Sequence, residues 1–238
     1  MRLNNYVTPT NDAMQRFRIP LNHFKIYATF MERNILEEQY KALDIEEDRD
    51  TTLEDELDNP FQETWTHFLS EKHMFSVQFP SILRSSLLIS IYSFLENQLI
   101  RLCKELQESR DLSIKVNNIN NKGIEKAKIY LKNVVGIDFP TNSKEWQDIK
   151  RYQYIRNNFA HSEGILDSND KNLLLAIATL DAVDIMGDDF LGKNIILYKS
   201  FIPTLIETVE GFLSKIESQY LELLYPHHYL YKGGRSFE

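Results

Sequence analysis

The sequence predicts an all-α protein, a bundle of helices with one small appended β-hairpin. Only eight of its 238 residues are glycine, which disfavours a fold rich in turns. Apolar residues recur at three- and four-residue spacing along most of the chain, the period of an amphipathic helix. One stretch, residues 182–198, breaks that period and has the pattern of a short hairpin. No repeat or low-complexity linker divides the chain, so a single helical domain is expected over residues 20–238.

The first expected element is a long helix near the N-terminus. Residues 1–19 are polar and are expected to form a flexible N-terminal segment. From Leu21 toward Leu43 the apolar residues follow helical spacing, which predicts one continuous helix. The acidic stretch over residues 44–60 is expected to be a loop or a frayed helix end. A short amphipathic helix closed by Pro80 is expected next from its apolar positions, Trp65, Phe68, Leu69 and Met74.

The remaining helices follow from their start and stop signals. Pro80 favours a helix start, and the run Ser81–Leu102 is apolar nearly all round, which predicts the central buried helix. An Asn-rich turn leads into a basic helix that ends near Val135–Gly136, as helices often end before glycine. Another helix begins around Ser143. After the hairpin, a strongly amphipathic last helix is expected over about Ser200–Leu224.

The composition indicates a soluble protein of a reducing compartment, and we expect it in the cytoplasm. The single cysteine, Cys103, excludes an intrachain disulfide and is most simply a buried thiol. The polar N-terminus has no apolar core of the kind that a signal peptide requires. No stretch approaches the roughly eighteen uninterrupted apolar residues of a membrane span, so no membrane partner is expected.

The charge is negative overall but uneven along the chain. The net charge of −8 argues against general nucleic-acid coating, which depends on basic surface. Residues 44–58 hold nine acidic residues against one arginine, whereas residues 101–132 hold eight basic and four acidic ones. Residues 144–161 hold four basic and two acidic ones. A nucleic acid could therefore bind the second half of the chain; the alternative is that all three stretches are solvated helix faces.

The most informative stretch is the short run that ends the helix after Ser143. Arg156, Asn157, Asn158 and His161 fall within six positions, just before Gly164. Cleavage of an RNA phosphodiester needs a group that moves protons near neutral pH and a cation that holds the phosphate. Histidine and arginine supply these two roles. The run therefore predicts a candidate ribonuclease site.

Helix geometry limits how these side chains meet. Residues four apart lie about 40° from each other around a helix, and residues five apart lie about 140° from each other. Asn157 and His161 therefore share a face, and Tyr154 falls close to it. Arg156 does not project beside His161 from one straight helix. Either the helix breaks between them, or Arg156 meets the histidine of another copy in a two-fold dimer.

On these residues the chain resembles the HEPN domains, small all-α modules of prokaryotic toxin and antiphage systems and of some eukaryotic ribonucleases. Their motif is an arginine, most often followed directly by asparagine, then a histidine four to six residues after the arginine; here it is Arg156-Asn157-x-x-x-His161. The resemblance covers about Ser81–Leu224, with an aromatic-apolar helix leading into the motif and Glu96 on the earlier apolar helix. Some relatives carry a tyrosine two residues after the histidine, where this chain has Glu163.

The resemblance implies a HEPN-like bundle with endoribonuclease activity that needs no metal or other cofactor, at a homodimer interface. His161 would act as general base or acid, and Arg156 would stabilise the phosphate charge. Asn157 would orient the phosphate or fix the imidazole tautomer, with Glu96, Tyr154 and Asn158 in support. The expected partners are RNA, a second copy of the chain, and an antitoxin or another defence-system protein.

Other interpretations remain open. The chain could be a non-catalytic HEPN interaction module that recruits a partner, or a purely structural helical subunit, in which case the motif is only a helix-end cap. Glu63, His67 and Glu71 share one helix face and could offer metal ligands, but a solvated charged face is preferred. His227 and His228 could bind a metal or stack a base; a tail packed on the bundle is the alternative.

Overall fold

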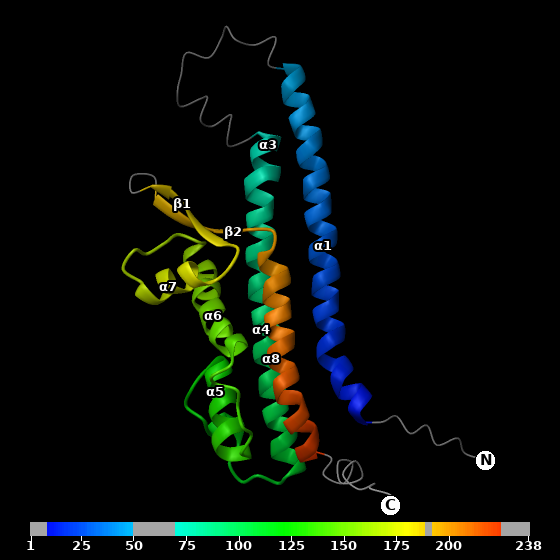
Figure 1. Ribbon diagram of the computed structural model, residues 1–238. Coiled ribbons are helices and arrows are strands. Elements are labelled where there is room, and N and C mark those ends of the chain that lie inside the picture. The colour runs from blue at the N-terminus through cyan, green and yellow to red at the C-terminus, as the bar shows by residue number, and fades with distance from the viewer. Residues whose placement is uncertain (1–8, 50–69, 189–191, 225–238) are drawn as a thin grey trace, which may run out of the picture. The chain divides into compact units, whose positions relative to one another are not determined.

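A computed structural model describes residues 9–49, 70–188 and 192–224 (Figure 1). The expected all-α character with one small hairpin is confirmed. By its contacts the chain divides into two compact units, and the single helical domain over residues 20–238 stays a prediction. Among the described residues, the first unit comprises residues 9–23, 90–154 and 204–224, and the second comprises residues 24–49, 70–89, 155–188 and 192–203.

The N-terminal helix, α1 (Pro9–Arg49), is longer than the sequence predicts. Residues 9–19, expected to be flexible, are helical, as are residues 44–49 of the acidic stretch. Tertiary packing explains the early start: Phe17 and Leu21, on either side of Pro20, are only 4% and 1% exposed. Their burial offsets the backbone hydrogen bond that proline removes from a helix interior. Residues 1–8 and 50–69 lie outside the described residues.

The next helical run is continuous from Glu71 to Ser109. It consists of α3 (Glu71–His73), a π-helical turn η1 (Met74–Gln78), and α4 (Phe79–Ser109). The prediction that one helix ends and another starts at Pro80 is therefore wrong. The N–H of Phe79 bonds the carbonyl of Met74, five residues back. This wider turn admits the proline, which has no backbone donor, without breaking the helix. Of the short helix expected here, residues 65–69 lie outside the described part of the chain.

The first unit packs around the second half of α4. Its other elements include η2 (Val116–Asn118), α5 (Gly123–Tyr130), the π-turn η3 (Leu131–Val135), and most of α6 (Lys144–Ser162) and of α8 (Phe201–Leu224). Gly136 ends η3 with a left-handed φ of 86°, as the sequence predicts. The rings of Phe139, Trp146 and Phe212 form one cluster, with centroids 4.9 to 5.6 Å apart.

The second unit contains the hairpin and one helix that the sequence pattern did not lead us to expect. β1 (Val183–Asp188) pairs antiparallel with β2 (Gly192–Leu197), so the expected hairpin is confirmed; residues 189–191 are not described. The unexpected helix is α7 (Lys171–Thr179), which starts where the Asp170 carboxylate accepts from the N–H groups of Asn172 and Leu173. An Asp N-cap before an apolar run is a recognisable sequence signal.

Two further observations bear on the compartment. Cys103 is fully buried, as predicted, and burial raises the pKa of its thiol to about 12. Among the described residues, the run Glu71–Ser109 is long and apolar enough to cross a membrane by length and composition, and its most apolar stretch is 28% buried. The core helix of a soluble protein meets the same criterion, so this run does not by itself indicate a membrane span.

Candidate functional site

α6 carries the Arg/His motif on its last two turns. The helix starts where the Ser143 hydroxyl accepts from the N–H of Trp146, at 3.2 Å, which is an N-cap interaction. Four of its apolar residues have exposed fractions of 3% or less: Trp146, Ile149, Tyr152 and Ile155. This buried stripe agrees with the aromatic-apolar lead-in that the sequence predicts. The stripe fixes which side of α6 faces the core, and thus the directions in which the motif residues project.

The end of α6 is held by a tight turn and by the hairpin. Glu163 and Gly164 have left-handed φ values of 53° and 88°, and the N–H of Ile165 returns to the carbonyl of Ser162 at 2.8 Å. The carbonyl of Gly164 then accepts from the N–H of Ile195 on β2, at 2.9 Å. The last turn of α6 is therefore anchored to β2 within the second unit.

Three motif residues differ in exposure and in contacts. His161 is exposed on the last turn, whereas Arg156 and Asn157 are half-buried. Arg156 Nη1 donates to Asn157 Oδ1 at 3.1 Å, so the asparagine helps to orient the guanidinium. The imidazole is thus accessible to a ligand, while the guanidinium is partly fixed by its neighbour.

α6 is unbroken from Lys144 to Ser162, which removes one of the two ways in which the motif residues could meet. The sequence left open a helix break between Arg156 and His161, and there is none. Within one chain these two side chains leave the helix about 140° apart. The unbroken α6 excludes the helix break, and a meeting of Arg156 with the histidine of another copy stays a prediction.

The supporting residues lie on two helices, Tyr154 and Asn158 on α6 and Glu96 on α4. Asn158 Nδ2 donates to the carbonyl of Ile165 at 2.8 Å, so this amide closes the turn after α6. Tyr154 and Glu96 are half-buried and belong to the first unit. A Cβ on Gly123 at the start of α5 would collide with the Glu96 carboxylate, so Glu96 lies against that helix N-terminus, a favourable place for a negative charge.

The candidate metal ligands are only partly described. Of the expected set, Glu63 and His67 lie outside the described residues, and so do His227 and His228. Glu71 is exposed at the start of α3. Within residues 9–49, 70–188 and 192–224, no three His, Cys, Asp or Glu side chains are grouped to hold a metal ion.

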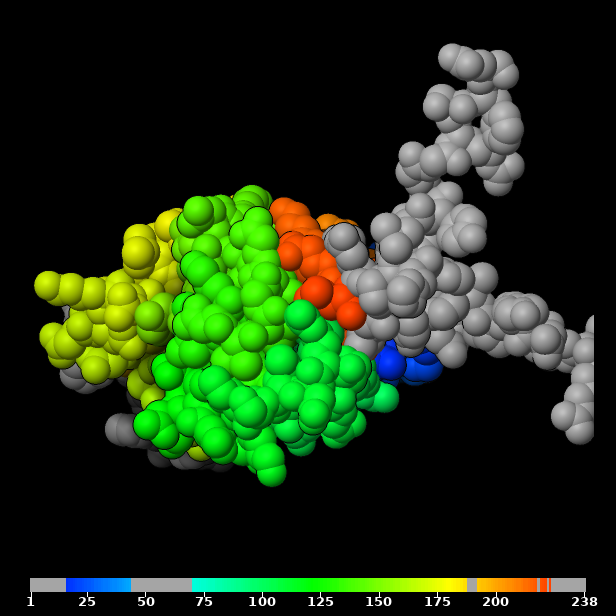
Figure 2. Space-filling view, turned by 90° about the horizontal axis from the view of Figure 1, so that it is seen from below, coloured from blue at the N-terminus to red at the C-terminus, as the bar shows by residue number. Residues whose placement is uncertain are grey.

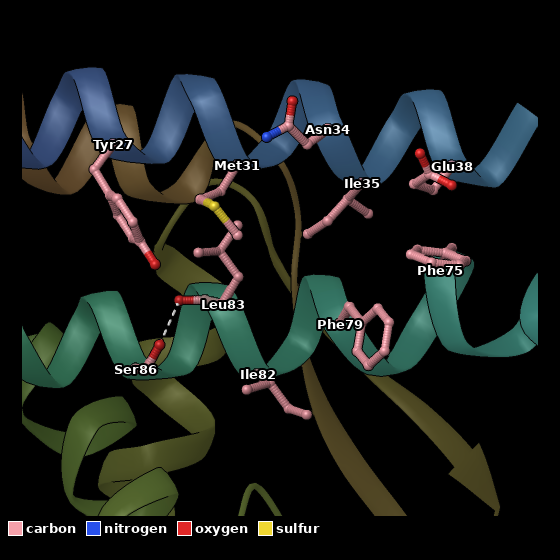
Figure 3. A pocket seen from close by; sticks show the side chains of 10 residues that line it. All are labelled: Tyr27, Met31, Asn34, Ile35, Glu38, Phe75, Phe79, Ile82, Leu83 and Ser86. Carbon is pink, nitrogen blue, oxygen red and sulfur yellow. Dashed lines mark hydrogen bonds between the residues drawn. The ribbon is translucent and has the colours of Figure 1, made fainter.

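The second unit also contains an apolar groove, which lies between α1 and the run from η1 into α4 (Figure 3). It has a volume of about 350 Å³. Each wall uses one helix face at three- and four-residue spacing, with Tyr27, Met31 and Ile35 on α1 facing Phe75, Phe79, Ile82 and Leu83. The polar groups of the lining are Asn34, Glu38 and Ser86. Apart from Ile19 and Ile114, every exposed large apolar side chain of the described residues belongs to this unit.

The groove could not be predicted from the sequence, for a physical reason. Its lining residues have the spacing of an ordinary buried stripe, and spacing identifies a helix face but not how completely another element covers it. Phe79 and Ile82 are 38% and 61% exposed, although Ile82 belongs to the run predicted to form the central buried helix. An exposed apolar groove often marks a binding surface.

No family model, curated protein or solved structure matches this chain. The resemblance to HEPN domains stays a prediction from the motif between Arg156 and His161.

Proposed function

We propose that this protein is a HEPN-type endoribonuclease that cleaves RNA without a metal ion, in a site shared by two copies of the chain. The observation that carries the proposal is the position of His161, exposed on the last turn of an unbroken α6. Arg156 and Asn157 lie on the preceding turn and contact each other. This places a proton-transfer group and a fixed cation at one anchored helix end.

The chemistry follows from the two side-chain types. His161 takes the proton from an RNA 2′-hydroxyl, whose oxygen attacks the adjacent phosphorus. The bond from phosphorus to the 5′-oxygen breaks, this oxygen takes a proton from water, and the hydroxide left behind takes the proton back from the imidazolium of the same His161. The products are a 2′,3′-cyclic phosphate and a 5′-hydroxyl. Arg156 stabilises the extra negative charge on the five-coordinate phosphate, and Asn157 acts as a positioning residue for its guanidinium.

The need for a second copy comes from the angle between the side chains. Arg156 and His161 project about 140° apart from one straight helix, too far apart for both to contact one phosphate from the same face. In a two-fold dimer, each arginine would contact the phosphate beside the partner's histidine. The homodimer is thus part of the proposal and not a separate feature.

A biological setting is proposed on the same basis. The resemblance favours a toxin or antiphage defence component of the cytoplasm, held in check by an antitoxin or another partner protein. The fully buried thiol of Cys103 fits a reducing compartment. Expression of the wild-type chain in a bacterium should then slow growth, and the His161→Ala variant should not.

The decisive test is RNA cleavage in EDTA together with the solution mass. Wild type should be a dimer and should leave cyclic or 3′-phosphate ends. The His161→Ala and Arg156→Ala variants should lose cleavage by about a hundredfold or more, which is typical for loss of a proton-transfer group or of an oxyanion-stabilising donor, and should keep the helical circular-dichroism spectrum.

The control is His23→Ala, which removes an exposed histidine of α1 and should leave cleavage unchanged. Activity that survives His161→Ala, or that EDTA abolishes, would contradict the proposal. A folded wild-type monomer that cleaves RNA would contradict the shared site.

The groove favours a second candidate function, a non-catalytic HEPN interaction module. Two helix faces of apolar residues form a trough into which an amphipathic helix of a partner protein fits by the helix-in-groove mode. The acidic stretch expected to help in such recruitment lies mostly outside the described residues.

Two variants separate the candidate functions. Ile82→Glu places a charge in the exposed part of the groove and should abolish capture of the partner without changing RNA cleavage. His161→Ala should abolish RNA cleavage without changing capture of the partner. If neither variant changes RNA cleavage or partner capture, the protein is best interpreted as a purely structural helical subunit.

A further inference from the structure

We infer that the first unit carries an RNA-binding surface where the loop between α4 and α5 lies beside α5. This surface, the lysine strip, comprises three lysines and four exposed asparagines: Lys115, Lys122, Lys126, Asn117, Asn118, Asn120 and Asn121. The inference rests on the proposed function for the choice of RNA as the partner. It concerns where the RNA is held and not how it is cut.

Two hydrogen bonds fix the loop against its neighbouring helices. The Gln107 side chain on α4 accepts from the N–H of Val116 at 3.1 Å, and the Tyr130 hydroxyl on α5 donates to the carbonyl of Ile114 at 2.8 Å. Lys115 lies between these two anchored residues in sequence. The loop is therefore held in place, and Lys115 is held beside α5.

The other two lysines follow the same side of α5. Lys122 immediately precedes the helix, Lys126 lies one turn later, and Tyr130 lies one turn beyond that. Residues four apart lie on one helix face. Tyr130 ends α5, and its hydroxyl contacts Ile114, so the residue before Lys115 lies at the C-terminal end of this helix. The three lysines therefore lie along the eight residues of α5, with Lys122 and Lys126 at its start and Lys115 near its end.

The strip keeps its positive charge although the chain as a whole carries −8. Residues 112–124 contain no acidic residue. The nearby Glu125 is engaged by Lys128 and by Lys150, while Glu96 against Gly123 brings one negative charge. Within the described part of the chain, the three lysines have no ion pair of their own. Phosphates are thus attracted to the strip and repelled by the acidic stretches.

RNA suits this surface better than another polyanion because of the asparagines. Each side-chain amide both donates and accepts hydrogen bonds, which matches unpaired base edges and the ribose 2′-hydroxyl. In Figure 2 the segment that contains the end of α4, the loop and α5, drawn in green, forms an open face turned toward the viewer. A single strand therefore has access to it.

The test measures RNA binding apart from cleavage. A labelled single strand of about 20 nucleotides, longer than one typical binding site, is titrated by fluorescence anisotropy in the His161→Ala background. The combined Lys115→Gln, Lys122→Gln and Lys126→Gln variant should bind about tenfold more weakly at low salt. The slope of log affinity against log salt should become smaller by about 2, because each lost phosphate contact removes roughly 0.7.

The matched control makes the same charge change on the second unit, with Lys25→Gln, Lys171→Gln and Lys199→Gln, and should bind like the parent. Equal weakening by both triple variants would overturn the inference, and so would tight binding to anionic phospholipid vesicles in place of RNA.

The two proposals fail separately. If the wild-type chain binds RNA through the lysine strip but cleaves no RNA, the RNA-binding surface is supported and the ribonuclease proposal is contradicted. If the triple lysine variant with His161 intact still cleaves RNA with an unchanged KM, the ribonuclease proposal is supported and the RNA-binding surface is contradicted.

Discussion

The guanidinium of Arg84 donates to both carboxylate oxygens of Glu32, with Nε 2.6 Å from Oε1 and Nη2 2.8 Å from Oε2. Its Nη1 also donates to the carbonyl of Leu197 at 2.8 Å. The side chains of Arg84 and Glu32 are only 15% and 11% exposed. A single arginine thus ties α1, α4 and β2 together within the second unit, next to the groove residue Leu83.

Replacement of Arg84 by lysine should destabilise the protein although the charge is kept. A lysine ammonium cannot reproduce the planar two-point contact with Glu32 and also reach Leu197. We expect the free energy of unfolding in urea to fall by about 1–3 kcal/mol. The control is Arg33→Lys, whose pair with Glu37 is long at 3.7 Å and largely exposed, and which should cost less than about 0.5 kcal/mol. Equal effects of the two variants would contradict this prediction.

The turn after α6 should not tolerate a side chain at Gly164. A Cβ there would lie 2.8 Å from Cε1 of Phe159, at a φ of 88°. Gly136 has a similar φ of 86° with nothing within 4 Å, so Gly136→Ala measures backbone strain alone, about 1–2 kcal/mol. Gly164→Ala should cost about 1 kcal/mol or more beyond that, because the ring must also move.

Two further readouts test the turn at Gly164. A second change, Phe159→Leu, should recover the excess cost of Gly164→Ala but not the strain. Because this turn anchors the end of α6, RNA cleavage should also fall in Gly164→Ala under conditions where the protein stays folded. Unfolding curves that coincide for the two alanine variants would show that the Phe159 contact is unimportant.

A site shared by two copies should be restored by mixing two inactive variants. The Arg156→Ala chain keeps His161, and the His161→Ala chain keeps Arg156. Random pairing makes half of the dimers mixed, and each mixed dimer has one intact Arg/His pair, so about one quarter of the wild-type activity should return. The measurement is RNA cleavage after the two variants are unfolded together and refolded. No recovery in a refolded dimer would mean that one chain supplies both groups.

A carboxyl group in the first unit should make stability depend on pH. Glu217 is 5% exposed, and its Oε1 has no hydrogen-bond partner among the described residues. Burial raises the pKa of Glu217, which nearby Arg18 counteracts in part. A raised pKa in the folded state favours the protonated form. Its contribution to stability is therefore complete below the unfolded value of about 4.3 and is lost as pH rises through the folded pKa.

Glu217→Gln should therefore gain stability relative to wild type as pH rises from about 4 toward neutrality, since the amide never ionises. The urea midpoints of wild type and of Glu217→Gln, measured from about pH 4 to neutrality, test the direction of this change in stability. The comparison variant is Glu210→Gln, which removes the half-exposed partner of Arg18 and should show little of this trend. Parallel curves for wild type and Glu217→Gln would contradict a raised pKa.

Most of the helical elements are predictable from the sequence because their signals are local. The apolar run after Pro80, the stop at Gly136, the Ser143 start and the amphipathic last helix each depend on residues within a few turns of one another. The hairpin is predictable in the same way from its turn and its apolar strands. α7 has an equally local signal in Asp170, so this helix was predictable too.

The early start of α1 before Pro20 and the wrong prediction at Pro80 have another origin. Local rules treat a proline inside a helix as a break. At Pro20, the burial of Phe17 and Leu21 compensates for the missing hydrogen bond, and at Pro80 the preceding π-turn does so. Both compensations depend on residues distant in sequence or on a backbone geometry that spacing does not encode.

The sequence by itself determined which residues belong to the candidate site, since the choice of Arg156, Asn157 and His161 depends on side-chain chemistry. Only the tertiary structure decided that α6 continues unbroken past them, that Asn158 serves the turn, and that an apolar groove stays open between two helix faces. The physical reason is that periodicity fixes the direction of each side chain around its own helix. What lies opposite that side chain is fixed by packing between segments far apart in the chain.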